Sequence, residues 1–162
     1  MINSTRDKSD FLKHIGIAAD HAGFELKEYL KKQLGIRGYE VTDFGNSTLN
    51  PDDDYPDYII PLAQAVTIGA ISRGIAICGS GVGACIAANK VPGVRACLIH
   101  ETFSARQGVE DDAMNILCLG GHVVKDDFAL ELTSVFLDAR FITLERHLRR
   151  LDKVTAIENN NK

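Results

Sequence analysis

GIAICGSGVGACIAANK, residues 74–90, holds the strongest structural signal in this chain of 162 residues. An unbroken apolar run ends at Cys78 and is followed by a glycine-dense turn and a second apolar segment. This order predicts a buried strand, a tight turn and a helix. Backbone N–H groups at the start of such a helix face outward and favour an anion. The segment therefore predicts an anion-binding turn at the end of a strand.

The rest of the chain repeats this alternation of strand and helix. Short apolar runs bounded by glycine or polar residues predict five strands, at residues 14–19, 39–44, 74–78, 94–99 and 115–119. Longer segments predict six helices, at residues 23–35, 57–71, 84–90, 101–112, 126–139 and 143–158. Nearly continuous apolar strands are typical of a parallel sheet that is covered on both faces. The expected fold is α/β, a three-layer α/β/α sandwich around a five-stranded, Rossmann-like parallel sheet.

Composition narrows the possible functions. With 18 Lys and Arg against 22 Asp and Glu, the formal charge is −4, which disfavours nucleic-acid and membrane-surface partners. No apolar run is long enough to cross a membrane, and the polar N-terminus lacks the apolar core of a signal peptide. The four cysteines show no C-x-x-C spacing and are expected to be reduced thiols. We expect a cytoplasmic protein with a polar extension at 1–13 and a single domain at 14–162.

Polar residues follow every expected strand. In an open parallel sheet, ligands bind at the carboxyl ends of the strands. The residues there are Asp20 and His21, the acidic loop 45–56, the turn 78–83, His100 with Glu101, and Gly120 to His122. We therefore expect a polar pocket at this edge of the sheet. The G-x-G-x-G spacing matches neither the dinucleotide fingerprint nor the P-loop, which disfavours dinucleotide and ATP binding.

Two of these positions leave alternatives open. The helix dipole and nearby amides are expected to lower the pKa of the Cys78 thiol, as in a catalytic base or nucleophile. The same position suits a buried cysteine that acts as a small apolar residue. His21 could donate to a phosphate or relay a proton. Alternatively, Asp20 caps the next helix and His21 is simply solvated.

Two charged pairs lie nearer the C-terminus. Asp111 and Asp112 end an expected helix, where the helix dipole disfavours negative charge, so they are either offset by a cation or catalytic role or merely solvated. Arg146 and Arg150 are four residues apart and share one helix face. A solvated, salt-bridged helix would account for part of this cluster. The arginine spacing favours anion binding, since guanidinium groups suit phosphate or carboxylate.

Together these stretches resemble the ribose-5-phosphate isomerase B family, which also includes the galactose-6-phosphate isomerase subunits. The resemblance covers residues 14–158 and rests on IGIAADHAGFELKEYL, DYPDY, AICGSGVGACIAANKVPGVRA, MNILCLGGHVV and the closing RH-x-x-R…AIE segment. It implies an aldose–ketose isomerase that needs no metal and no cofactor, interconverting ribose 5-phosphate and ribulose 5-phosphate through a cis-enediolate. It also implies a homodimer or homotetramer with the site shared between subunits, in which the C-terminal helix takes part in oligomerisation.

The resemblance also implies roles for individual residues. Cys78 would be the base that moves the proton between C1 and C2. The Ser80 hydroxyl and the turn amides would hold the enediolate oxygen, from Gly79, Ser80, Gly81, Val82 and Gly83. Sugar and phosphate would be bound by Asp20, His21, Tyr55, Arg146 and Arg150.

Two positions depart from the family pattern. Asp111 and Asp112 stand where the family usually has the His-Asn pair that opens the furanose ring, so Asp111 becomes the candidate acid or base and Asp112 a substrate contact. His122 stands where many members have an arginine that contacts phosphate. Alternative functions are therefore isomerisation of another sugar, either a hexose 6-phosphate or an unphosphorylated sugar, and non-catalytic binding of a sugar phosphate.

Overall fold

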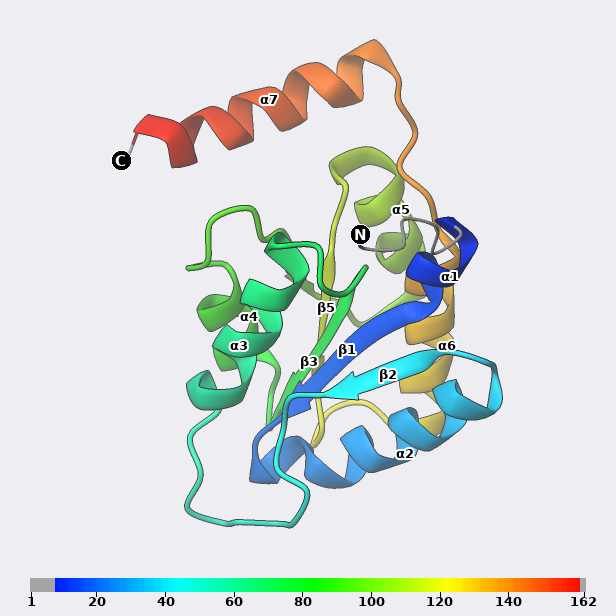
Figure 1. Ribbon diagram of the computed structural model, residues 1–162, viewed down its shortest axis with the longest axis vertical. Helices are drawn as coiled ribbons and strands as arrows, with labels where there is room; N and C mark the ends of the chain where they lie inside the picture. The colour runs from blue at the N-terminus through cyan, green and yellow to red at the C-terminus, as the bar shows by residue number, and fades with distance from the viewer. Residues whose placement is uncertain (1–7, 161–162) are drawn as a thin grey trace, which may run out of the picture.

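The computed structural model describes residues 8–160. Five parallel strands form the centre of the molecule (Figure 1). The strands lie in the order β2-β1-β3-β5-β4. Their bounds are β1 His14–Ala19, β2 Glu40–Asp43, β3 Gly74–Cys78, β4 Ala96–Leu98 and β5 Ile116–Gly120. All five predicted strands are confirmed, and the bounds of β1 and β3 are those expected. The other three differ at their ends, where hydrogen bonding to neighbours rather than apolar pattern sets the limit.

Helices cover both faces of this sheet, which confirms the three-layer sandwich. One face carries α2 Phe24–Ile36, α5 Thr102–Asp112 and α6 Asp126–Asp138, and the other carries α3 Pro56–Thr67 and α4 Val82–Ala88. On α2, Leu26, Leu30 and Leu34 form the buried stripe that their four-residue spacing predicts. The segment 57–71 was expected to be wholly helical, but α3 ends at Thr67. Gly69 follows with φ +72°, a left-handed conformation that is typical of the end of a helix.

Of the expected polar extension, residues 1–7 lie outside the described residues. Residues 8–13 form the short helix α1 Lys8–Lys13, which leads directly into β1. After β1, the 3-10 helix η1 His21–Gly23 precedes α2. Among residues 8–160, no helix combines the length and apolarity that a membrane crossing requires.

The last helix, α7 Glu145–Asn160, lies beyond the end of the sheet (Figure 1). It contacts α5, and the Glu158 carboxylate accepts a 2.9 Å hydrogen bond from the Gly93 amide. Three apolar side chains of α7 are largely exposed in the single chain: Leu148 at 42%, Val154 at 53% and Ile157 at 63%. A helix that places this much apolar surface in water has the character of a contact surface.

Candidate active site

Cys78 ends the central strand β3 and lies under the glycine turn. Its side chain is buried, and its Sγ accepts a hydrogen bond of 3.2 Å from the Gly81 amide. Gly81 adopts φ +81° and precedes α4, while the Ser80 Oγ accepts a 3.3 Å bond from the Val82 amide. Only Gly79, Ser80 and Gly81 separate the end of β3 at Cys78 from the start of α4 at Val82. The turn therefore directs the Gly81 N–H at the thiol.

Gly81 is the residue on which this turn depends. A Cβ at this position would lie 2.8 Å from the carbonyl carbon of Leu119 in the neighbouring strand. Gly69 has a similar φ but open space around it, so it is a matched control. Gly69→Ala is expected to lower the free energy of unfolding by about 1–2 kcal/mol, the cost of a left-handed L-residue. Gly81→Ala should lose about 1–3 kcal/mol more because β5 must shift. Urea unfolding compares the two variants, and equal losses would show that the β5 contact is unimportant.

The glycine turn is flanked by Tyr55 and His122. A Cβ built on Gly83 would lie 2.8 Å from the Tyr55 ring, and one built on Gly79 would lie 3.2 Å from Cδ2 of His122. The His122 amide also donates to the Gly79 carbonyl at 3.0 Å. A larger residue at Gly83 would displace the Tyr55 ring, and one at Gly79 would push the His122 ring slightly. Both aromatic side chains therefore lie beside the thiol turn, as expected.

Asp20 and His21 lie next to this turn, at the end of β1. The Asp20 carboxylate accepts bonds of 3.0 and 3.2 Å from the amides of Ala22 and Gly23, so its capping role is confirmed. The Asp53 carboxylate binds both the His21 amide, at 2.8 Å, and the His21 Nδ1, at 2.9 Å. The hydrogen bond from His21 to the Asp53 carboxylate raises the pKa of His21 above its ordinary value. Asp53 was not predicted as a site residue, although the acidic run 52–54 was its sequence signal.

Asp111 lies in a second cluster, where α5 meets α7. Its Oδ2 accepts a 2.9 Å hydrogen bond from Gln107, and its Oδ1 lies 3.5 Å from Nε2 of the buried His147. The Arg146 Nε lies 3.1 Å from the same Nε2. His147 Nδ1 lies 2.9 Å from the Ile142 carbonyl, a geometry that suits an Nδ1–H donor. The imidazole thus links the Arg146 guanidinium to the neighbourhood of the Asp111 carboxylate.

Asp112 and Arg150 belong to the same cluster. They line a cavity of about 250 Å³ together with Arg95, Cys97, Met114, Leu151 and Val154. Arg95 comes just before β4, and Asp112 comes shortly before β5. The cavity therefore lies at the amino end of these two strands.

The predicted site residues consequently lie at opposite edges of the sheet. Cys78 pairs with Gly120 at the carboxyl end of β5, whereas Asp112 precedes the amino end of that five-residue strand. A strand advances about 3.3 Å per residue. The carboxyl-edge group is Asp20, His21, Tyr55, Cys78, Gly79, Ser80, Gly81, Val82, Gly83 and His122. The amino-edge group is Asp111, Asp112, Arg146 and Arg150. A single chain does not bring both groups around one substrate.

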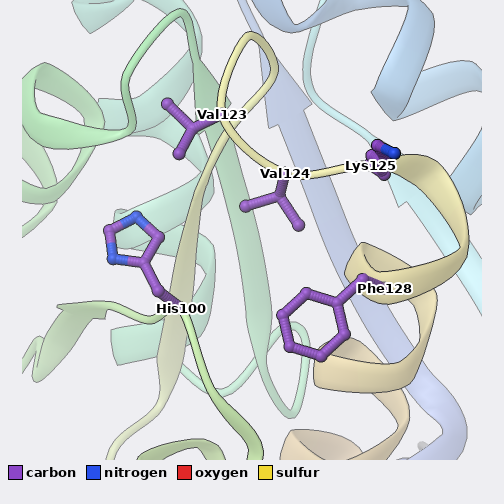
Figure 2. A pocket seen from close by; sticks show the side chains of 5 residues that line it. All are labelled: His100, Val123, Val124, Lys125 and Phe128. Carbon is purple, nitrogen blue, oxygen red and sulfur yellow. The ribbon is translucent and has the colours of Figure 1, made fainter.

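A further cavity, of about 500 Å³, opens at the carboxyl edge (Figure 2). Figure 2 shows His100 on one side and Phe128 on the other, with Val124 between them and Val123 above His100. Lys125 completes the lining. Glu101, which was expected in the pocket with His100, instead caps α5 by accepting the Ser104 amide at 2.9 Å. Within residues 8–160, no group of three or more His, Cys, Asp or Glu is arranged to hold a metal ion.

Comparison with known proteins gives consistent matches over nearly the whole chain. A family model described as Ribose/Galactose Isomerase matches residues 15–154. The structure of Clostridium thermocellum ribose-5-phosphate isomerase B matches with a TM-score of 0.88 at 44% identity, covering 92% of this chain and 99% of that one. The Mycoplasma genitalium ribose-5-phosphate isomerase B with bound ribulose-5-phosphate has a TM-score of 0.85 at 38% identity, with coverages of 90% and 96%. The D-erythrulose-4-phosphate isomerase of Pectobacterium atrosepticum is 38% identical over 127 residues, covering 78% of this chain and 84% of that protein.

Proposed function

Because this chain belongs to the ribose/galactose isomerase family, we propose that it interconverts ribose 5-phosphate and ribulose 5-phosphate with Cys78 as the base. The observation that carries this proposal is the buried Cys78 thiol, which accepts the Gly81 amide of the glycine turn at 3.2 Å. An aldose–ketose isomerisation needs one base that reaches both C1 and C2 and donors for the oxygen that becomes negative. The turn supplies both within one short segment.

The proposed reaction moves one proton between neighbouring carbons. The Cys78 thiolate removes the proton from C2 of the open-chain aldose, and the electrons of that C–H bond form the C1–C2 double bond of an enediolate. The Ser80 hydroxyl and the turn amides that are not bonded to Cys78 or Ser80 hold the negative oxygen, a contact worth about 3 kcal/mol per donor in comparable sites. The thiol then returns the proton to C1, the hydroxyl proton of O2 moves to O1, and the product is the ketose.

The remaining site residues bind the substrate in this proposal. Asp20 and Tyr55 contact the sugar, and His122 and Asp112 extend the polar lining. His21, Arg146 and Arg150 hold the phosphate, because cationic donors suit its oxygens. Asp111 acts as the acid or base that opens the furanose ring.

We further propose that the site is completed by a second copy of the chain, in a homodimer or homotetramer. The amino-edge group cannot reach Cys78 within one chain, so a partner's α5 and α7 would have to supply it. The exposed apolar face of α7 supports this arrangement. We also place the protein in the cytoplasm, since a reducing compartment keeps the Cys78 thiol free.

Proton NMR with ribose 5-phosphate in D2O tests the reaction directly. We expect ribulose 5-phosphate to form with deuterium at C1, because the proton taken from C2 exchanges with solvent on Cys78 before a proton is returned to C1. Conversion without any deuterium at C1 would contradict exchange of the transferred proton with solvent at Cys78. Binding of the sugar phosphate with neither conversion nor exchange would instead indicate a non-catalytic binding module.

A second candidate substrate is a four-carbon ketose phosphate. Asp111 is held by Gln107 and stands where ring-opening chemistry was expected. A tetrose phosphorylated on O4 cannot close a furanose ring, because O4 would be the ring oxygen, so it needs no ring opening. The relative from Pectobacterium is named for such a substrate. A panel of erythrulose 4-phosphate, hexose 6-phosphates and free sugars decides the question, and a wide preference for ribose 5-phosphate would remove this alternative.

A further inference from the structure

The acidic loop between β2 and α3 holds a nearly buried carboxylate against His21. The Asp53 side chain is only 4% exposed, whereas the His21 side chain is 40% exposed. One oxygen, Oδ1, binds both the amide and the Nδ1 of His21, and the other accepts a 3.2 Å hydrogen bond from the Asn46 side chain. Burying a carboxylate is costly unless donors compensate it. The three hydrogen bonds to Asp53 compensate the cost of burying its carboxylate, and they fix where it lies.

The geometry decides which nitrogen of His21 is available to a ligand. Because Asp53 occupies Nδ1, only Nε2 remains for a substrate. In the neutral ring with hydrogen on Nδ1, Nε2 carries a lone pair and would repel a phosphate oxygen. Only the imidazolium presents an Nε2–H donor while keeping the bond to Asp53. The contact with Asp53 thus suits the charged form of His21.

We propose that Asp53 is a positioning residue that fixes the His21 ring and holds it in the imidazolium form that binds the substrate phosphate. This inference rests on the proposed function, in which His21 is a phosphate ligand. It adds to that function a residue that touches no substrate atom, and it predicts how phosphate recognition depends on pH.

Asp53 is held in place by Asn46, which is itself bonded to a buried lysine. The Asn46 side chain that donates to Asp53 also contacts the Tyr58 hydroxyl at 2.6 Å. The Asn46 carbonyl accepts a 2.9 Å bond from the Nζ of Lys27, whose side chain is fully buried. Asn46 therefore ties the loop to Lys27 of α2 and to Tyr58 of α3. Such support fixes the carboxylate near one geometry.

Two carboxylates near His21 favour its charged form, and burial of the ring opposes them. The hydrogen bond to Asp53 is the largest cause that raises the pKa of His21, and the negative charge of Asp20 also favours the charged ring. His122 is the titratable group on the β5–α6 loop, which packs against η1 near Ala22. Because the pKa of His21 is raised, the imidazolium persists above its ordinary value of 6.5 and is lost as pH rises through the raised value. Phosphate binding through His21 should follow the same course.

Asp53→Asn tests this inference by removing the charge and keeping the shape. Asp52→Asn is the matched control, since Asp52 is an exposed carboxylate of the same loop with no bond to His21. The ratio of variant to wild-type KM for ribose 5-phosphate is expected to rise roughly five- to tenfold at pH 8 and to stay near one at pH 5.5, because His21 is protonated in both proteins at low pH. The Asp52→Asn ratio should stay near one throughout. The titration of the substrate phosphate cancels in each ratio.

A second readout follows the ring itself and does not depend on turnover. The NMR signal of the His21 Cε1 proton, assigned with a His21→Gln variant, is expected to titrate at a lower pH in Asp53→Asn than in wild type. In wild type, inorganic phosphate should shift this signal more strongly at pH 6 than at pH 8.5, and unphosphorylated ribose should not. This last measurement is made on the wild-type protein, so a folding defect of Asp53→Asn does not affect it.

The outcomes separate the inference from the proposed function. An unchanged His21 titration in Asp53→Asn would overturn the inference, as would KM ratios that are equal at both pH values. Absence of a phosphate effect on the wild-type His21 signal would also overturn it. Failure of wild type to isomerise any sugar phosphate, with phosphate still shifting the His21 signal, would remove the proposed reaction but leave the role of Asp53 standing.

Discussion

Cys78→Ala is expected to lower the isomerisation rate roughly 10²- to 10⁴-fold, the range that a positioned general base contributes. Alanine at this position removes only a buried thiol, so the strand and the glycine turn should remain folded. Steady-state rates with ribose 5-phosphate, together with exchange of the C2 proton in D2O, measure the loss.

The control for this prediction is Cys85→Ala, which removes a half-buried thiol from α4 without touching the turn. Its rate is expected to stay near that of wild type. Denaturant unfolding of both variants separates lost chemistry from lost folding. A Cys78→Ala protein that is folded and retains a rate near wild type would refute Cys78 as the base.

Mixing two inactive variants is expected to restore activity if the site is shared between subunits. Cys78→Ala damages the carboxyl-edge group and Arg150→Ala damages the amino-edge group. Random pairing of the two chains in a two-fold dimer makes half of the dimers mixed, each with one intact site, so about a quarter of wild-type activity should return. The two proteins are unfolded and refolded together before the assay.

Cys78→Ala mixed with Ser80→Ala is the matched control, because both changes lie in the same group and no mixed dimer would contain an intact site. Its activity should not exceed that of the two variants measured separately. Differently tagged chains show by pull-down that mixed dimers have formed. If mixed Cys78→Ala and Arg150→Ala dimers form without recovering activity, the two edges do not meet in one site.

Local sequence patterns predicted the elements and the edge on which the thiol lies. The apolar run before Cys78, the glycines after it and the four-residue leucine spacing of α2 act over a few residues, and parallel strands direct their carboxyl ends to one edge. Helix ends were less predictable. Gly69 ended α3 early because its left-handed conformation, not its place in the apolar pattern, decides where the helix stops.

The roles of Asp20 and Glu101 also required the structure. Both side chains accept backbone amides and cap the elements that follow, an alternative that the sequence left open for Asp20. Which interpretation holds depends on side-chain orientation, and residue type alone does not determine it.

The amino-acid sequence by itself determined the α/β fold, the glycine turn around Cys78 and the family to which the chain belongs, because these depend on short-range periodicity and on motifs that are contiguous in the chain. Only the tertiary structure decided that Asp53 binds His21, which lies 32 residues earlier in the chain. It also decided that Asp111 and Arg150 lie at the edge of the sheet opposite Cys78. Both are long-range placements, set by how the loop after β2 and the helices α5 and α7 pack against the sheet, and no local pattern encodes that packing.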